Sequence, residues 1–60
     1  MKPIQKVNGQ LCYPIQIGLR AFICGKQDIL TSPVVDVLQR TEEKIVFETQ
    51  NTVYELKQAA

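Results

Sequence analysis

The chain has 60 residues, of which 45% are hydrophobic and 22% charged, and its formal net charge is +1. This composition is typical of a globular protein and excludes disordered and low-complexity classes. The near-neutral charge argues against attraction to nucleic acid or acidic lipid by an overall field. A chain of this length buries only about 60% of its unfolded surface on folding, so a partner or a second subunit would add useful stability.

The sequence predicts a soluble, cytoplasmic protein without membrane contact. Its apolar runs are all shorter than the roughly 20 residues that span a bilayer. The segment Met1 to Gln10 has Pro3, Asn8 and Gly9 where a secretory signal has a continuous apolar stretch.

The two cysteines, Cys12 and Cys24, match no C-x-x-C or zinc-binding pattern. In a reducing cytosol we expect both to be free and at least partly buried. The alternative is a disulfide that closes the loop between them, which the chain-entropy model values at about 3 kcal/mol.

The N-terminal half begins with an expected hairpin. Asn8-Gly9 is typical of a tight hairpin turn, here between short strands at 4–7 and 11–13, and Pro14 then interrupts the ladder. From Gln16 to Gly25 the residues alternate as in a half-buried strand. We expect the core side of that strand to carry Ile17, Leu19, Ala21 and Ile23, with Arg20 and Phe22 on the opposite face.

The segment from Gly25 to Pro33 is expected to be the longest loop, held to the core by Ile29 and Leu30. Loops on a rigid scaffold often carry binding residues. Lys26 and Asp28 are therefore candidates for partner contact.

The C-terminal half predicts a meander of strands at about 34–40, 44–50 and 52–57, with a frayed tail at 58–60. Ile45, Phe47 and Thr49 alternate with Val46, Glu48 and Gln50, and Tyr54 and Leu56 continue the pattern. The alternative is a helix that begins near Pro33, since Val34, Val37 and Leu38 also fit helical spacing.

Short strands in so short a chain favour one all-β domain over residues 1–60, a small, partly open, five-stranded barrel of SH3-like type. An α+β fold is the alternative. The stretches Leu30-Thr31-Ser32-Pro33-Val34 and Phe47 to Leu56 resemble small SH3-like barrels of bacteriophages and mobile elements. The resemblance covers about the last half of the chain and implies a fold and an origin, with no chemistry attached.

The residues argue against an enzyme. Histidine is absent, which removes the commonest general base and zinc ligand. Glu48 and Glu55 could oppose each other across the last hairpin, but we expect them on a solvated face with Lys44 and Lys57 nearby rather than in a catalytic cleft. We therefore predict no catalytic residue, no metal and no cofactor.

The sequence favours a non-catalytic module that binds a larger protein through exposed loops or an unpaired sheet edge. The candidate contacts are Tyr13, Arg20, Phe22, Lys26 and Asp28. A competing interpretation has Phe22 covering part of the core. A homodimer is a further option, and the strand at 52–57 carries Glu55 and Lys57 as charges that would protect an exposed edge.

The alternative function is a nucleic-acid-binding barrel. It would place Arg20, Lys26, Arg40 and Lys44 around the rings of Phe22 and Tyr13. Interspersed acidic residues make this basic groove weak.

Overall fold

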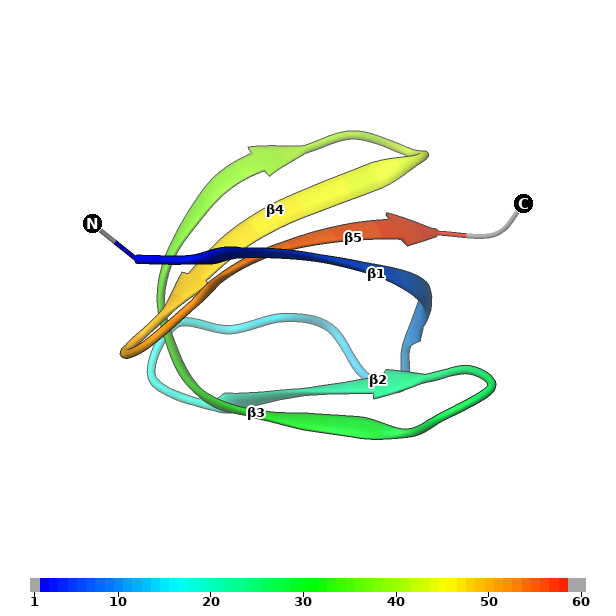
Figure 1. Ribbon diagram of the computed structural model, residues 1–60, viewed down its shortest axis with the longest axis horizontal. Coiled ribbons are helices and arrows are strands. Elements are labelled where there is room, and N and C mark those ends of the chain that lie inside the picture. Colours follow the sequence, from blue (N-terminus) through cyan, green and yellow to red (C-terminus); the bar gives the residue numbers. More distant parts are fainter. Residues whose placement is uncertain (1, 59–60) are drawn as a thin grey trace.

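The computed structural model describes residues 2–58, which form five strands and contain no helix. The strands are β1 (Ile4–Leu11), β2 (Arg20–Cys24), β3 (Ile29–Arg40), β4 (Lys44–Thr49) and β5 (Val53–Gln58). They form a closed barrel in chain order, in which parallel pairing of β1 with β5 completes the circle (Figure 1). The predicted all-β, five-stranded barrel is confirmed and is consistent with the SH3-like type, although it is closed rather than partly open.

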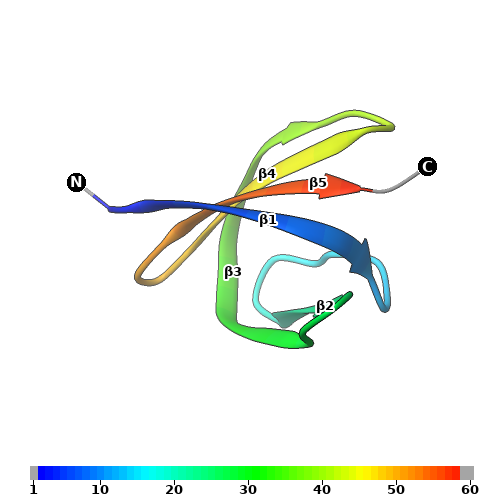
Figure 2. The same cartoon turned by 45° about the vertical axis from the view of Figure 1, so that its right-hand side comes forward.

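The long strand β3 serves both halves of the barrel. Its first part pairs with β2 and its second part with β4, and bulges lie between Val34 and Asp36 and between Val37 and Gln39. Figure 2 shows β3 rising from the hairpin with β2 to the sheet formed by β4, β5 and β1. The alternative helix near Pro33 is therefore wrong, because a continuous strand covers that segment.

The predicted loop at 25–33 is shorter than expected, because β3 already begins at Ile29. In this part of β3 the polar residue Thr31 is accommodated because its side chain hydrogen-bonds the backbone of the neighbouring strand β2. Thr31 is buried, and its Oγ1 accepts a hydrogen bond from the backbone N–H of Ala21 at 3.0 Å. A threonine that suggested a loop thus stabilises an irregular strand pairing.

The core confirms the alternation predicted for the C-terminal half. Ile45, Phe47, Thr49 and Leu56 are buried. The ring of Tyr54 stacks on Phe47 with centroids 5.3 Å apart. The last hairpin turns between Thr49 and Thr52, where the N–H of Thr49 donates to the Thr52 carbonyl at 2.8 Å.

The hairpin predicted at Asn8-Gly9 is wrong, because β1 runs through both residues. Gly9 has φ +153°, and a Cβ at this position would lie 2.6 Å from the carbonyl oxygen of Cys24. A Cβ on Gly25 would similarly lie 3.1 Å from the carbonyl oxygen of Asn8. Glycine is needed here because two backbones cross closely, as glycines in strands often indicate.

The strand predicted at 16–25 is reduced to β2. Ala21 and Ile23 are buried as expected, whereas Ile17 and Leu19 are 65% and 53% exposed. Residues before Arg20 form a loop in which the N–H of Leu19 donates to the Gln16 carbonyl at 3.2 Å. That loop contributes the buried Ile15 to the core instead.

Cys12 and Cys24 form a disulfide with their Cα atoms 5.8 Å apart, so the expectation of free cysteines is wrong. Cys12 is exposed and Cys24 half-buried. The N–H of Cys12 donates to the Phe22 carbonyl at 2.9 Å and thereby extends the pairing of Leu11 with Ile23. Strand pairing thus brings the two thiols together.

The predicted edge strand at the C-terminus is also wrong. β5 pairs with β4 on one side and with β1 on the other, so Glu55 and Lys57 do not lie on an unpaired sheet edge. Gln58, expected in the frayed tail, ends β5. Residues 59–60 of that tail lie outside the described residues.

Candidate functional site

The outward side of β2 carries two of the predicted contact residues. Ala21 and Ile23 point into the core, so the alternating residues Arg20 and Phe22 point outward. Phe22 is half-buried, and the half-buried side chains that pack on the core are Leu11, Ile29, Val37 and Tyr54. The competing interpretation, in which Phe22 covers part of the core, stays a prediction, since the residue is half-buried.

A specific hydrogen bond holds Tyr13 beside Arg20. Its hydroxyl donates to the backbone carbonyl of Arg20 at 2.6 Å, and 41% of the residue stays exposed. The disulfide at the preceding residue holds this segment beside β2. Tyr13 thus occupies a fixed position on the surface.

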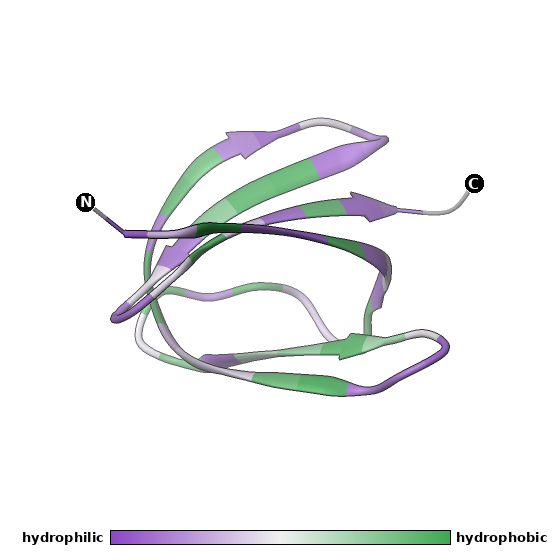
Figure 3. Ribbon diagram, viewed as in Figure 1, coloured by the Kyte–Doolittle hydropathy of each residue, from purple (hydrophilic) through white to green (hydrophobic). Residues whose placement is uncertain are grey.

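A fourth residue, which is apolar, completes this surface and was missed as a contact residue from the sequence. Leu30 on β3 is paired directly with Phe22 and is 58% exposed. Residues directly opposite in an antiparallel pair lie on the same face, so Leu30 is beside Phe22. Figure 3 shows hydrophobic colour along β2 and the start of β3. We call Tyr13, Arg20, Phe22 and Leu30 the β2 outer face.

The charge on the β2 outer face is unbalanced within the described chain. The ion pairs of residues 2–58 join Lys2 to Glu48 and Lys44 to Glu55. Arg20 is exposed and has no ion-pair partner in this part of the protein. An acidic group from outside would therefore meet an unmatched guanidinium beside apolar side chains.

Lys26 and Asp28 lie in the turn between β2 and β3 and do not belong to the β2 outer face. Lys26 lines a pocket of about 650 Å³, whereas Asp28 does not contribute to its wall. The structure thus divides the predicted contact residues between the β2 outer face and this turn.

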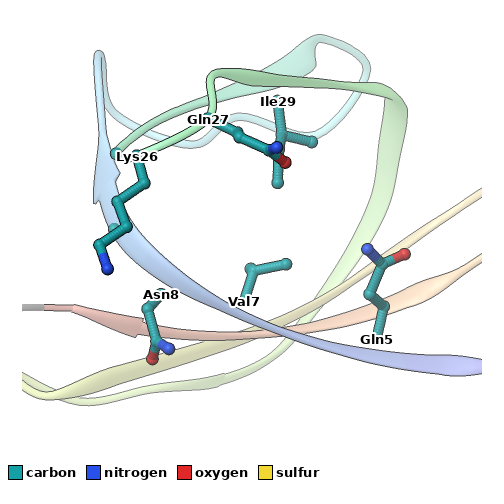
Figure 4. Close-up of a pocket in the computed structure, with 8 residues that line it drawn as sticks. Gln5, Val7, Asn8, Lys26, Gln27 and Ile29 are labelled. Atoms are coloured by element: carbon teal, nitrogen blue, oxygen red, sulfur yellow. The ribbon is translucent and has the colours of Figure 1, made fainter.

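The pocket, which we call the seam groove, opens between β1 and the β2–β3 turn. Its lining side chains are Gln5, Val7, Asn8, Lys26, Gln27 and Ile29. Val7 from β1 and Ile29 from β3 project into the opening from opposite sides, with Lys26 and Asn8 at one end and Gln5 at the other (Figure 4). The groove therefore has apolar walls and a polar rim.

The basic residues considered for nucleic-acid binding do not form one groove. Arg40 ends β3, at the opposite end of the strand from Leu30. Lys44 lies 3.5 Å from Glu55. The positive charge near Phe22 and Tyr13 is thus that of Arg20, since Lys26 lines the separate groove.

The carboxylates do not form an opposed pair in the last hairpin. In the pairing of β4 with β5, Glu48 lies opposite Val53 and Glu55 lies opposite Val46. The direct opposition of Glu48 and Glu55 considered from the sequence therefore does not occur. Glu48 forms an ion pair with Lys2, and Glu55 forms one with Lys44. Lys44 was expected near these carboxylates on a solvated face. Among residues 2–58, no cluster of three metal-ligating side chains is assembled.

Comparison with family models, with curated proteins and with solved structures finds no match to this chain. Within the described residues, no helix is long and apolar enough to cross a bilayer.

Proposed function

We propose that this protein is a non-catalytic interaction module that binds a folded protein through the β2 outer face. The observation that carries the proposal is the presence of Tyr13, Phe22 and Leu30 on the same part of the surface as Arg20, which has no ion-pair partner among residues 2–58. Aromatic and arginine side chains are enriched among residues that dominate binding energy. The expected partner presents an apolar surface with an acidic side chain opposite Arg20.

An interface of ordinary size would cover a large share of this small protein. A standard interface buries about 800 Å² per partner, roughly a fifth of this protein's accessible surface of 4271 Å². The loop that leads into β2 also carries the exposed side chains of Ile17 and Leu19. A partner that buries this area would therefore contact residues beyond the four of the β2 outer face.

Rigid positioning supports the same proposal. The Tyr13 hydroxyl bond and the disulfide fix the segment that flanks β2. Binding then loses less conformational entropy than it would with a free loop. The small size and the resemblance to barrels of phages and mobile elements suit an accessory or inhibitory factor that occupies a surface of a larger host protein.

The test is affinity capture with the tagged protein, after nuclease treatment and at low and moderate salt. We expect a stoichiometric protein that survives both treatments and is lost with Arg20→Glu. Arg40→Glu, a charge reversal at the far end of β3, serves as the matched control and should retain it.

Recovery of nucleic acid alone, released by salt, would overturn the proposal. So would capture that both arginine variants reduce equally. Recovery of further copies of this chain as the sole protein would replace the proposed partner with a homodimer.

A further inference from the structure

The β1–β2 seam is the least paired junction of the barrel. β1 pairs with β5 from Ile4 to Gly9. Within the described residues it pairs with β2 at Gln10 and Leu11, next to the crossing at Gly9. The earlier part of β1 therefore has a strand neighbour on one side and the seam groove on the other.

The backbone of this part of β1 presents hydrogen-bonding groups to the open side. The Val53 N–H donates to the Pro3 carbonyl at 2.9 Å, which fixes the direction of that carbonyl toward β5. Backbone groups of successive strand residues point to alternate sides, so Ile4 and Lys6 direct theirs away from β5. Exposed strand edges of this kind pair readily with another chain.

The side chains beside that edge fit an extended segment. Val7 and Ile29 supply apolar contact from the two sides of the opening, and Gln5 and Gln27 supply neutral amides at its rim (Figure 4). An added strand places every second side chain on one face. One apolar side chain of an incoming strand would therefore enter between Val7 and Ile29.

Lys26 determines the charge of the occupant. It is the charged residue of the groove lining, and it has no ion-pair partner within residues 2–58. An acidic side chain near that end of the groove would find a complementary ammonium group and the Asn8 amide. A basic segment would meet repulsion there.

We propose that the seam groove binds an extended acidic peptide as an added strand on β1. Backbone bonds to Ile4 and Lys6 give affinity, an apolar side chain fills the space between Val7 and Ile29, and a carboxylate pairs with Lys26. Strand addition of this kind is a recurring mode of peptide recognition. The site is separate from the β2 outer face, so each proposal can fail without the other.

The experiment titrates a blocked peptide that alternates valine with glutamate into the intact protein and follows backbone amide signals by NMR. We expect shifts at Ile4, Lys6, Val7 and Ile29. Lys26→Glu should weaken binding about fivefold, the upper range for one exposed ion pair. The control Arg40→Glu reverses an exposed charge at the end of β3 that does not line the groove and should leave affinity unchanged.

Two further peptides distinguish strand addition from a general charge effect. A version with lysine in place of glutamate should bind the native protein more weakly and the Lys26→Glu variant more strongly. A version N-methylated at alternate residues should lose binding, because it cannot donate to the β1 edge.

Shifts confined to other strands, equal effects of Lys26→Glu and Arg40→Glu, or full binding of the N-methylated peptide would each overturn the proposal. Absence of shifts into the millimolar range would do the same. Leu30→Asp should leave the titration unchanged, which separates this site from the β2 outer face.

Discussion

Replacement of Gly9 by alanine probes the closest backbone approach of the barrel. Gly9 has φ +153°, and a Cβ there would lie 2.6 Å from the carbonyl oxygen of Cys24. That oxygen belongs to backbone held by the pairing of Gln10 with Cys24, so it cannot move without disturbing the seam.

The cost has two parts. A conformation reserved for glycine costs about 1–3 kcal/mol for another residue. Relief of an overpacked contact adds typically about 1–3 kcal/mol. A domain of this length has a total stability of about 3–9 kcal/mol, so Gly9→Ala should remove about half of it or more.

Gly18→Ala is the matched control. Gly18 has φ +93°, but a Cβ there would meet nothing within 4 Å. It should show the conformational cost alone, about 1–2 kcal/mol. The difference between the two variants isolates the contact with Cys24.

Urea denaturation followed by circular dichroism measures both free energies of unfolding, and an unchanged slope shows that the comparison is valid. We expect Gly9→Ala to be less stable than Gly18→Ala by about 1–3 kcal/mol. Equal losses in the two variants would refute the close crossing of β1 and β2.

Two further predictions concern the disulfide and the buried threonine. Reduction of the disulfide, or Cys12→Ser with Cys24→Ser, should lower the unfolding free energy by about 3 kcal/mol in the chain-entropy model. The pairing would be contradicted if reductant left the unfolding free energy of the native protein unchanged and both cysteines reacted readily with an alkylating reagent. Thr31→Val should cost about 1–3 kcal/mol, because the buried N–H of Ala21 loses its acceptor. In the control Thr41→Val, the exposed Lys44 N–H that loses its bond can turn to water, so the cost should stay within about 0.5 kcal/mol; equal losses in denaturation experiments would remove the role assigned to Thr31.

The disulfide also bears on the predicted cytoplasmic location. Disulfides persist in oxidising compartments and are rare in the cytosol. Trapping thiols by alkylation in intact cells would report which form the protein holds in its own environment. The cytoplasmic location stays a prediction that this measurement tests.

The sequence was most informative where the fold depends on local alternation. Ile45, Phe47 and Leu56 are buried in accord with the alternation predicted for their segments, because period-two patterning alone reports the side of the sheet. The same rule failed at Ile17 and Leu19, since their alternation runs on into a loop. Periodicity does not mark where pairing stops.

The other errors come from contacts between distant segments. Asn8-Gly9 has the signature of a hairpin, but the glycine serves the crossing with Cys24. Likewise, Thr31 belongs to a polar segment typical of a loop, but its hydroxyl accepts a hydrogen bond from the Ala21 N–H of the neighbouring strand. Both roles depend on strand register, which the linear sequence does not specify.

The candidate surface was partly predictable for the same reason. Alternation along one strand placed Arg20 and Phe22 together, whereas Leu30 joined them only through the pairing of β2 with β3. The seam groove depends on how few residues join β1 to β2, and no single segment indicates it.

The central claim, that a folded protein binds the β2 outer face, is tested most directly by two equivalent leucines on β3. Leu30 and Leu38 are 58% and 52% exposed, and Leu30 belongs to the face whereas Leu38 lies in the part of β3 that pairs with β4. We predict that Leu30→Asp abolishes capture of the partner while Leu38→Asp captures as much as the native protein. Equal capture by the two variants would contradict the claim.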